Sequence, residues 1–287
     1  MNNRVRLLFW LPVSLVVGAS SFVLVKLLLA IRERQRQGTC RTLFYRLFMV
    51  QSTIELFLIY IYLASRLLIM DHLAGRDFIM TLNGWFFPPF YYYGTIAYFF
   101  NVQVWGVMMH SLVRFSYICA PRLQLLLQRI PGPVWFALNT LVPFTVLARQ
   151  LLQDPVSFQT GNDSIAAITV PLHVVHSNAI QSTIVTVIGS VFCAACYVLV
   201  LRQLVRFRHV QDSSIADYRH ERALTLVGFV LFISQCTMTA CYLTIMVAHD
   251  NVLVIKSVRN LIIFPVVLVT FVNSWILTAT NRSLREL

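Results

Sequence analysis

Long apolar stretches alternate with short polar segments along the whole chain. Crossing the hydrocarbon core of a membrane takes about 20 apolar residues in a helix, at a rise of about 1.5 Å per residue. Seven stretches meet this requirement, so we predict seven membrane-spanning helices. The predicted spans cover about residues 7–31, 43–70, 91–119, 134–152, 179–201, 223–248 and 261–280.

The composition supports this interpretation of the pattern. Hydrophobic residues make up 58% of the 287 residues, and the mean hydropathy is +0.72. Charged residues make up 12% of the chain, whereas a soluble domain has roughly 25%. No polar, Gly-rich or Pro-rich stretch is long enough for a separate soluble domain. We therefore predict an all-α membrane protein, with one seven-transmembrane helix bundle over residues 1–287.

Prolines and polar segments set the predicted limits of several spans. Pro88 and Pro89 block helix continuation, so the third span is expected to begin just after them. Residues 154–178 form the longest polar segment and are expected to be a loop, and residues 202–222 are expected to be a charged linker. The first apolar run continues too far for a removed signal peptide, so we predict an uncleaved helix.

The distribution of lysine and arginine predicts the orientation, because cytoplasmic loops carry an excess of these residues. With the N-terminus outside and the C-terminus cytoplasmic, sixteen basic residues fall on the cytoplasmic side and seven on the outer side. The net charge of +12 lies in short clusters between spans, which suits anionic lipid rather than nucleic acid. The sequon at Asn162 then lies outside, where glycosylation is expected.

Glu55 lies in the middle of the second span, where a carboxyl group is costly. Two interpretations stay open. The carboxyl group either makes a structural hydrogen bond to a neighbouring helix or serves as an ion, proton or switch site. Asn273 in the seventh span lies at a similar depth. Because polar groups in a bundle tend to find one another, a contact between Glu55 and Asn273 is one hypothesis.

Other polar and aromatic residues in the third and sixth spans are candidates for ligand contacts. Asn101, Gln103 and His110 lie on the third span and would otherwise act as hydrogen bonders between helices, each worth about 1 kcal/mol. Aromatic residues on membrane helices more often serve packing or anchor the interface. The candidate ligand residues are Tyr93, Asn101, Trp105, Gln235, Thr239 and Tyr242.

Enzyme chemistry finds little support in the chain. Cys193 and Cys196 form a C-x-x-C inside an apolar span, without a second pair at zinc spacing, and are interpreted as small interior residues. His173 and His176 are expected in a loop, with no helix to align them as zinc ligands. Ser190 has no histidine in its span to act as a base. We therefore predict no enzyme activity, no metal and no cofactor.

Two short motifs resemble those of G-protein-coupled receptors. Residues 111–121, SLVRFSYICAP, resemble the receptor pattern S-x-x-R-[FY]-x-x-[IV]-x-x-P at the inner end of the third helix. Residues 42–48, TLFYRLF, resemble the start of the second helix in nematode serpentine chemoreceptors of the Srg superfamily, class V or class G. Glu55 and Arg66 also fit that pattern. With the predicted topology, the resemblance implies that Arg114 lies at the inner rim, accessible to a partner.

The chain departs from rhodopsin-like receptors in several places. Residues 154–178 contain no cysteine, so the usual disulfide to the third helix cannot form. The fifth and sixth spans contain no proline, which puts a proline-based movement of the sixth helix in doubt. The seventh span has NSWIL at residues 273–277 in place of N-P-x-x-Y. Lys256 precedes that span, so a light receptor is not expected.

The resemblance implies a chemosensory receptor that binds a small molecule or peptide in the outer half of the bundle and signals to a heterotrimeric G protein. Its expected location is the plasma membrane, in a sensory-neuron cilium if the resemblance extends so far. Glu55, Arg114 and Asn273 are the predicted switch residues. A transporter or channel that uses Glu55 is the main alternative, and a membrane partner protein without signalling is another. The predicted G-protein contacts are Arg114, Pro121, Arg122, Arg206 and Arg208.

Overall fold

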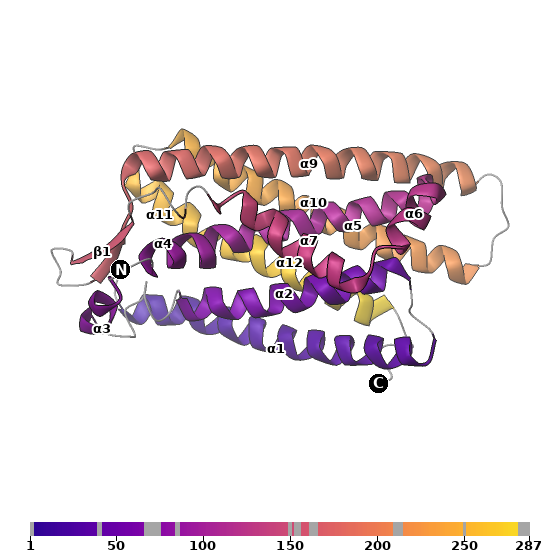
Figure 1. The fold of residues 1–287 in the computed structure, drawn as a ribbon, viewed down its shortest axis with the longest axis horizontal. Coiled ribbons are helices and arrows are strands. Elements are labelled where there is room, and N and C mark those ends of the chain that lie inside the picture. Colours follow the sequence, from indigo (N-terminus) through magenta and orange to yellow (C-terminus); the bar gives the residue numbers. More distant parts are fainter. Residues whose placement is uncertain are drawn as a thin grey trace.

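The computed structural model describes residues 3–38, 42–65, 76–83, 87–148, 151, 156–160, 166–208, 215–248 and 251–280. In these residues, long helices run side by side along one axis and form an elongated bundle (Figure 1). The seven main helices are α1 (Asn3–Arg36), α2 (Leu43–Ser65), α5 (Tyr98–Cys119), α7 (Gly132–Thr145), α9 (Leu172–Arg208), α10 (Ile215–Val247) and α12 (Ile263–Thr280).

Shorter elements lie between the main helices. α1 begins at one end of the bundle and α12 ends at the other (Figure 1), as expected for an odd number of passes. The shorter elements are α3 (Arg76–Thr81), α4 (Phe87–Pro89), η2 (Phe90–Ala97), α6 (Pro121–Gln128), α11 (Val252–Leu261) and the strands β1 (Ser157–Thr160) and β2 (Ala166–Thr169).

The helices differ in their capacity to cross a membrane. In the described chain, five segments are long and apolar enough: Trp10–Arg36, Leu43–Ser65, Phe87–Cys119, His173–Val205 and Gly228–Val247. α12 is apolar but shorter, over Ile263–Ala279. α7 has 14 residues, about 21 Å of helix, against a hydrocarbon core of about 30 Å. The predicted seven-helix, all-α architecture is confirmed.

α5 lies at the centre of the bundle. It contacts α2, α7, α9, α10 and α12, whereas α1 lies at the periphery against α2 and α12. The largest buried apolar cluster joins residues of α1, α2, α5, α9, α10, α11 and α12. α7 packs through a separate cluster around Trp135. α5 is therefore the helix that most of the other main helices pack against, while α10 also contacts α9 and α12.

Prolines explain where two helices are interrupted. Pro265 has no N–H to donate to the carbonyl group of Leu261, so the helix breaks at Ile262. α12 covers Ile263–Thr280, so it begins two residues after the predicted start of the seventh span, residues 261–280. α7 ends at Thr145, shortly after Pro143, so the predicted fourth span, residues 134–152, extends beyond α7.

The N-terminal part of the third span is a π-helix, η2. At its end the backbone N–H of Tyr98 donates to the carbonyl group of Tyr93, five residues earlier. Pro88 and Pro89 lie in α4, which leads directly into η2. In the first turn of a helix a missing N–H leaves no bond unmade. The prediction that this helix starts after the two prolines is therefore wrong.

The segment 154–178 is not the loop that was predicted. β1 and β2 form an antiparallel hairpin in which Phe158 lies opposite Ile168. Asn83 holds β1 in place, because its Nδ2 donates to the carbonyl group of Phe158 at 2.9 Å and its Oδ1 accepts from the Phe158 N–H at 2.8 Å. The Phe158 side chain is fully buried with Ile79 and Tyr91. β1 lies at one end of the bundle (Figure 1).

α9 extends beyond the predicted fifth span at both ends. It begins at Leu172, so His173 and His176 lie on a helix, contrary to the prediction. It continues to Arg208, and α10 begins at Ile215, so most of the predicted linker 202–222 is helical. Among the described residues, no three His, Cys, Asp or Glu side chains gather in a way that could hold a metal. Arg66 and Asn162 lie outside the described residues.

α9 and α10 approach closely at Gly228. A Cβ atom at this position would overlap the hydroxyl group of Tyr197, which is buried. Small residues at such positions let membrane helices pack backbone against side chain. Gly18 on α1 is the contrasting case, because a Cβ atom there would meet no atom within 4 Å.

Substitution G228A should therefore destabilise the bundle, since overpacking typically costs about 1–3 kcal/mol. The measurement is thermal unfolding of the purified chain in detergent. G18A is the matched control and should leave the melting temperature unchanged or slightly raised. Equal melting temperatures for the two variants would contradict the close approach at Gly228.

Candidate functional site

Gln103 links the centre of the bundle to α12. The side chain is fully buried on α5, and its Nε2 donates to the carbonyl group of Val266 at 3.0 Å and to the Thr270 hydroxyl at 2.8 Å. That hydroxyl donates in turn to the Val266 carbonyl group at 3.0 Å. Bonds of this kind between membrane helices contribute about 0.6–2 kcal/mol each. The polar link therefore fixes α12 against α5.

α5, α9 and α10 meet at Gly189. A Cβ atom at this position would lie 2.8 Å from Val104 Cγ1 of α5 and 3.5 Å from Gln235 Nε2 of α10. Val104 directly follows Gln103 in the chain. The two glutamines therefore lie at a similar level of the bundle, on two helices that face α9.

Gln235 is the least satisfied polar side chain at this level. It is 0% exposed, and neither Nε2 nor Oε1 has a hydrogen-bond partner among the described residues. The Oε1 of Gln103 is likewise without a partner within the described part of the chain. A buried donor or acceptor left unbonded costs about 1–3 kcal/mol. Native proteins keep few such groups, and each calls for an explanation.

Three of the predicted ligand residues share one face of α10. Gln235, Thr239 and Tyr242 follow one another at helical spacing, and all are buried. Thr239 Oγ1 donates to the Gln235 carbonyl group at 3.0 Å and lies 3.2 Å from Ser190 Oγ on α9. The Tyr242 ring meets Phe100 of α5 edge to face, with centroids 5.7 Å apart. Along this face, the amide of Gln235 comes first, then the hydroxyl groups of Thr239 and Ser190, and then the rings of Tyr242 and Phe100.

The other three predicted ligand residues lie elsewhere. Tyr93 is buried in η2 against Val156 just before β1, Val174 of α9 and the segment after α7, and its hydroxyl accepts from Asn178 Nδ2 at 3.1 Å. Trp105 packs on the cluster around Trp135, on the side of α5 that faces α2 and α7. Asn101 is half-buried one turn before Trp105 and lies on the same side of α5. The structure does not bring these three side chains to the α10 face.

Glu55 is held by its own helix. Gln51 Nε2 donates to Glu55 Oε1 at 2.7 Å and to the carbonyl group of Val102 on α5 at 3.1 Å. Gly106 leaves the space for this amide, since a Cβ atom there would overlap it. No hydrogen bond joins Glu55 to Asn273, and Asn273 Oδ1 has no partner among the described residues. The hypothesis of a contact between these two residues is therefore not supported by the structure.

Arg114 does not lie open at the rim of the bundle. Its side chain is 6% exposed, and its guanidinium group lies over the Phe44 ring, 5.0 Å from the centroid. His110 meets the same ring edge to face at 5.8 Å. The expectation of an accessible arginine is therefore wrong for this arrangement of the helices. A cation over an aromatic face is stabilised by about 0.5–2 kcal/mol, more when it is desolvated.

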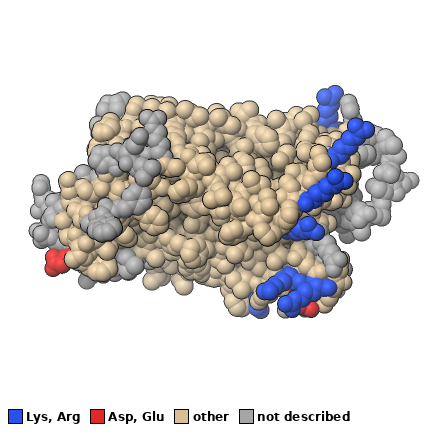
Figure 2. Space-filling view, in the orientation of Figure 1, with Lys and Arg blue, Asp and Glu red and all other residues tan. Residues whose placement is uncertain are grey.

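The remaining predicted G-protein contacts lie near the end of the bundle that carries the basic residues. Pro121 and Arg122 are exposed on α6. Arg206 and Arg208 lie in the last turns of α9, and their side chains are not described. Figure 2 shows lysine and arginine gathered at one end of the visible face. The described, solvent-accessible arginines at this end are Arg32, Arg34, Arg36, Arg46, Arg122, Arg129 and Arg202.

Sequence reasoning missed several residues of the central site. Gln51 lies one turn before Glu55, and that spacing alone predicts a hydrogen bond along the helix. Gly189 and Ser190 form a pair of small residues within a strongly apolar stretch, which is typical of close helix contacts. Thr270 carries no distinguishing signal, because most hydroxyl groups in these helices bond to their own backbone.

The fold and the apolar helices define a seven-helix membrane protein. The sequence model of the family described as serpentine type 7TM GPCR chemoreceptor Srv matches residues 14–287. The chain therefore belongs to this family of seven-transmembrane chemoreceptors. A search of curated proteins found no match. The resemblance to serpentine chemoreceptors is thus confirmed, while the absence of enzyme activity stays a prediction.

The two central glutamines should respond in opposite ways to replacement by methionine, which keeps their length. Q103M removes two hydrogen bonds and should lower the melting temperature of the purified chain. Q235M removes an amide that has no partner and should leave that temperature unchanged or raised. Equal losses for the two variants would show that Gln235 is bonded as well as Gln103.

Proposed function

We propose that this chain is a chemosensory receptor that binds a small molecule or peptide among α5, α9, α10 and α12 and signals to a heterotrimeric G protein. The observation that carries the proposal is Gln235, fully buried with both amide atoms unbonded among the described residues. Membership of a chemoreceptor family supports the sensory role. The wider placement in the Srg superfamily is part of the same proposal.

The chemistry of the ligand follows from the α10 face. An amide offers both a donor and an acceptor, so it suits a ligand group that has both, such as an amide, a carboxylic acid or an alcohol. Tyr242 and Phe100 lie further along the same face and suit an apolar or aromatic portion of the ligand. A site built in this way would reject an analogue that lacks the polar group, because Gln235 would again be left unbonded.

The basic end of the bundle supports the proposed orientation and partner. An excess of lysine and arginine is typical of the cytoplasmic side, which supports an N-terminus outside and a C-terminus inside. A cationic surface next to an anionic leaflet suits a G protein docked at that side. The exposed Pro121 and Arg122 are the proposed first contacts, with Arg206 and Arg208 nearby. A location in the plasma membrane, in a sensory cilium, belongs to this proposal.

Arg114 is the proposed switch between the two sides. In the present arrangement its guanidinium group is covered by Phe44 of α2. Ligand binding that favours a second arrangement of the helices would release the arginine toward the partner. Phe44 and Gln51 lie on the same helix, so a shift of α2 against α5 would affect both contacts. Glu55 and Asn273 remain proposed parts of this switch.

A transporter or channel that uses Glu55 is the less favoured function. The carboxyl group is bonded to Gln51 one turn away on the same helix, which is the pattern of a structural hydrogen bond. Ligand-evoked current without any G protein would favour the transporter or channel.

Replacement of Gln235 tests the ligand site. Q235M should raise the ligand concentration needed for a half-maximal response by about fivefold to 150-fold, since about 1–3 kcal/mol of binding is lost. The readout is G-protein activation in cells that express the chain, after a screen has found an activating compound. T244V on α10 is the matched control, because Thr244 is exposed. An unchanged response in Q235M would remove Gln235 from the site.

Replacement of Arg114 tests the switch. R114A should reduce ligand-evoked G-protein activation at least severalfold at matched surface expression, while direct ligand binding is retained. R32A is the control, since Arg32 is an exposed arginine at the same end of the bundle. Normal signalling in R114A would exclude the arginine from the mechanism, whereas loss of ligand binding would indicate a misfolded variant.

A further inference from the structure

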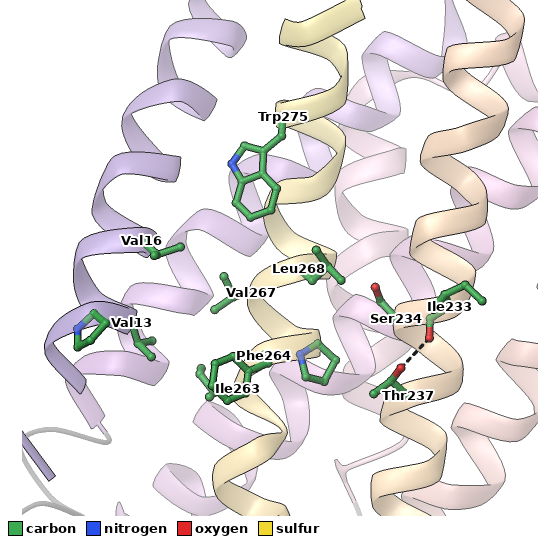
Figure 3. Close-up of a pocket in the computed structure, with 12 residues that line it drawn as sticks. Val13, Val16, Ile233, Ser234, Thr237, Ile263, Phe264, Val267, Leu268 and Trp275 are labelled. Atoms are coloured by element: carbon green, nitrogen blue, oxygen red, sulfur yellow. Dashed lines mark hydrogen bonds between the residues drawn. The ribbon is translucent and has the colours of Figure 1, made fainter. Parts of the chain in front are cut away.

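An apolar groove lies between α1, α10 and α12, away from the central site. Its volume is about 490 Å³, within the range of roughly 300–1,000 Å³ that small-molecule sites have. In Figure 3, Val13 and Val16 come from α1, Ile233 from α10, and Phe264 and Leu268 from α12. Val16, Ile233 and Phe264 are 48%, 47% and 53% exposed. The groove is therefore open to whatever surrounds the bundle at this depth.

The polar atoms of the lining are already bonded. Thr237 Oγ1 donates to the carbonyl group of Ile233 at 2.9 Å (Figure 3), and Ser234 Oγ donates to that of Val230 at 2.9 Å. Trp275 Nε1 donates to Ser20 Oγ at 3.2 Å. Among the described side chains, no residue that lines the groove has a buried polar atom without a hydrogen-bond partner. The groove therefore selects an occupant without hydrogen-bonding groups along its inserted part.

The length and direction of the groove fit one class of occupant. Its α12 wall extends from Ile263 to Trp275, a rise of about 18 Å along the helix. One leaflet of a bilayer has about 15 Å of hydrocarbon, half of the core of about 30 Å. The groove runs along helices that cross the membrane, so it lies parallel to the lipid chains. A single acyl chain of one leaflet matches the α12 wall in length and direction, and the α1 and α10 walls, Pro12–Val16 and Ile233–Thr237, cover part of that length.

We propose that the acyl chain of a bilayer lipid binds in this groove as a defined site. The site depends only on the membrane-spanning fold and not on the ligand or partner proposed above. An acyl chain in this groove would contact α12. Phe264 and Leu268 face the groove, whereas Val266 and Thr270 on the other side of α12 bond to Gln103. An acyl chain therefore presses on the helix that carries the central polar link, beside the break at Ile262.

The test uses the full chain, purified and reconstituted in nanodiscs of phosphatidylcholine. A small fraction of the lipid carries a photoreactive diazirine in the middle of one acyl chain. After illumination, mass spectrometry maps the labelled residues. Labelling of Val16, Ile233 and Phe264 should exceed severalfold that of Val191 and Val198, which are 65% and 63% exposed on α9. Equal labelling would mean general contact with surrounding lipid and would overturn the proposal.

Two variants fill the groove from opposite walls. L268W adds bulk on α12, and V16W adds bulk at the exposed rim on α1, where folding is least at risk. In both, labelling of the groove should fall to the α9 level, provided that the melting temperature shows a folded chain. V191W on α9 is the matched control and should leave the labelling of the groove unchanged.

Two further results would overturn the proposal. One is labelling of the groove that persists at the wild-type level in both L268W and V16W. The other is a cross-link between α1 or α12 of two copies of the chain when a bifunctional reagent replaces the labelled lipid. The second result would show that another copy, rather than lipid, covers the groove.

Discussion

The interior of this bundle offers no bulk water, so each polar side chain must bond to protein or remain unbonded at a cost. Most hydroxyl groups meet this constraint on their own helix, as Ser111 does with the carbonyl group of Val107 at 2.8 Å. Gln103 and Gln51 instead cross to neighbouring helices and fix α12 and α2 against α5. Gln235 satisfies neither pattern among the described residues, and this is why it belongs to the proposed ligand site.

Close contact between helices depends on the absence of side chains at a few positions. Gly106 admits the amide of Gln51, Gly189 admits Val104 and faces Gln235, and Gly228 admits the ring of Tyr197. Each glycine lies where a helix meets the side chain of another helix at short range. The Gln51 bond between α2 and α5, the candidate ligand face and the pairing of α9 with α10 therefore share one physical requirement, which is room for a large side chain beside a bare backbone.

The long apolar stretches predict the seven helices, because a helix that crosses a membrane needs about 20 apolar residues. The candidates Gln235, Thr239 and Tyr242 come together because helical spacing puts them on one face of α10. The pattern of apolar stretches has limits. It does not predict the burial of Arg114, because Phe44 comes from another helix and only packing brings the two together. The β1–β2 hairpin is missed because its strands are four residues each, too short for a clear alternating pattern. Membership of the chemoreceptor family agrees with the short motifs at residues 42–48 and 111–121.

The π-helix η2 has a consequence for how this family member could diverge. A π-turn carries one residue more than the α-helical turn it replaces. Loss of a single residue within Phe90–Ala97 would restore an ordinary turn, so the residues on either side would keep their orientation relative to α5. The register of α5 itself would not change. One deletion would thus alter only this tyrosine-rich turn while it leaves Gln103 and Arg114 where they are.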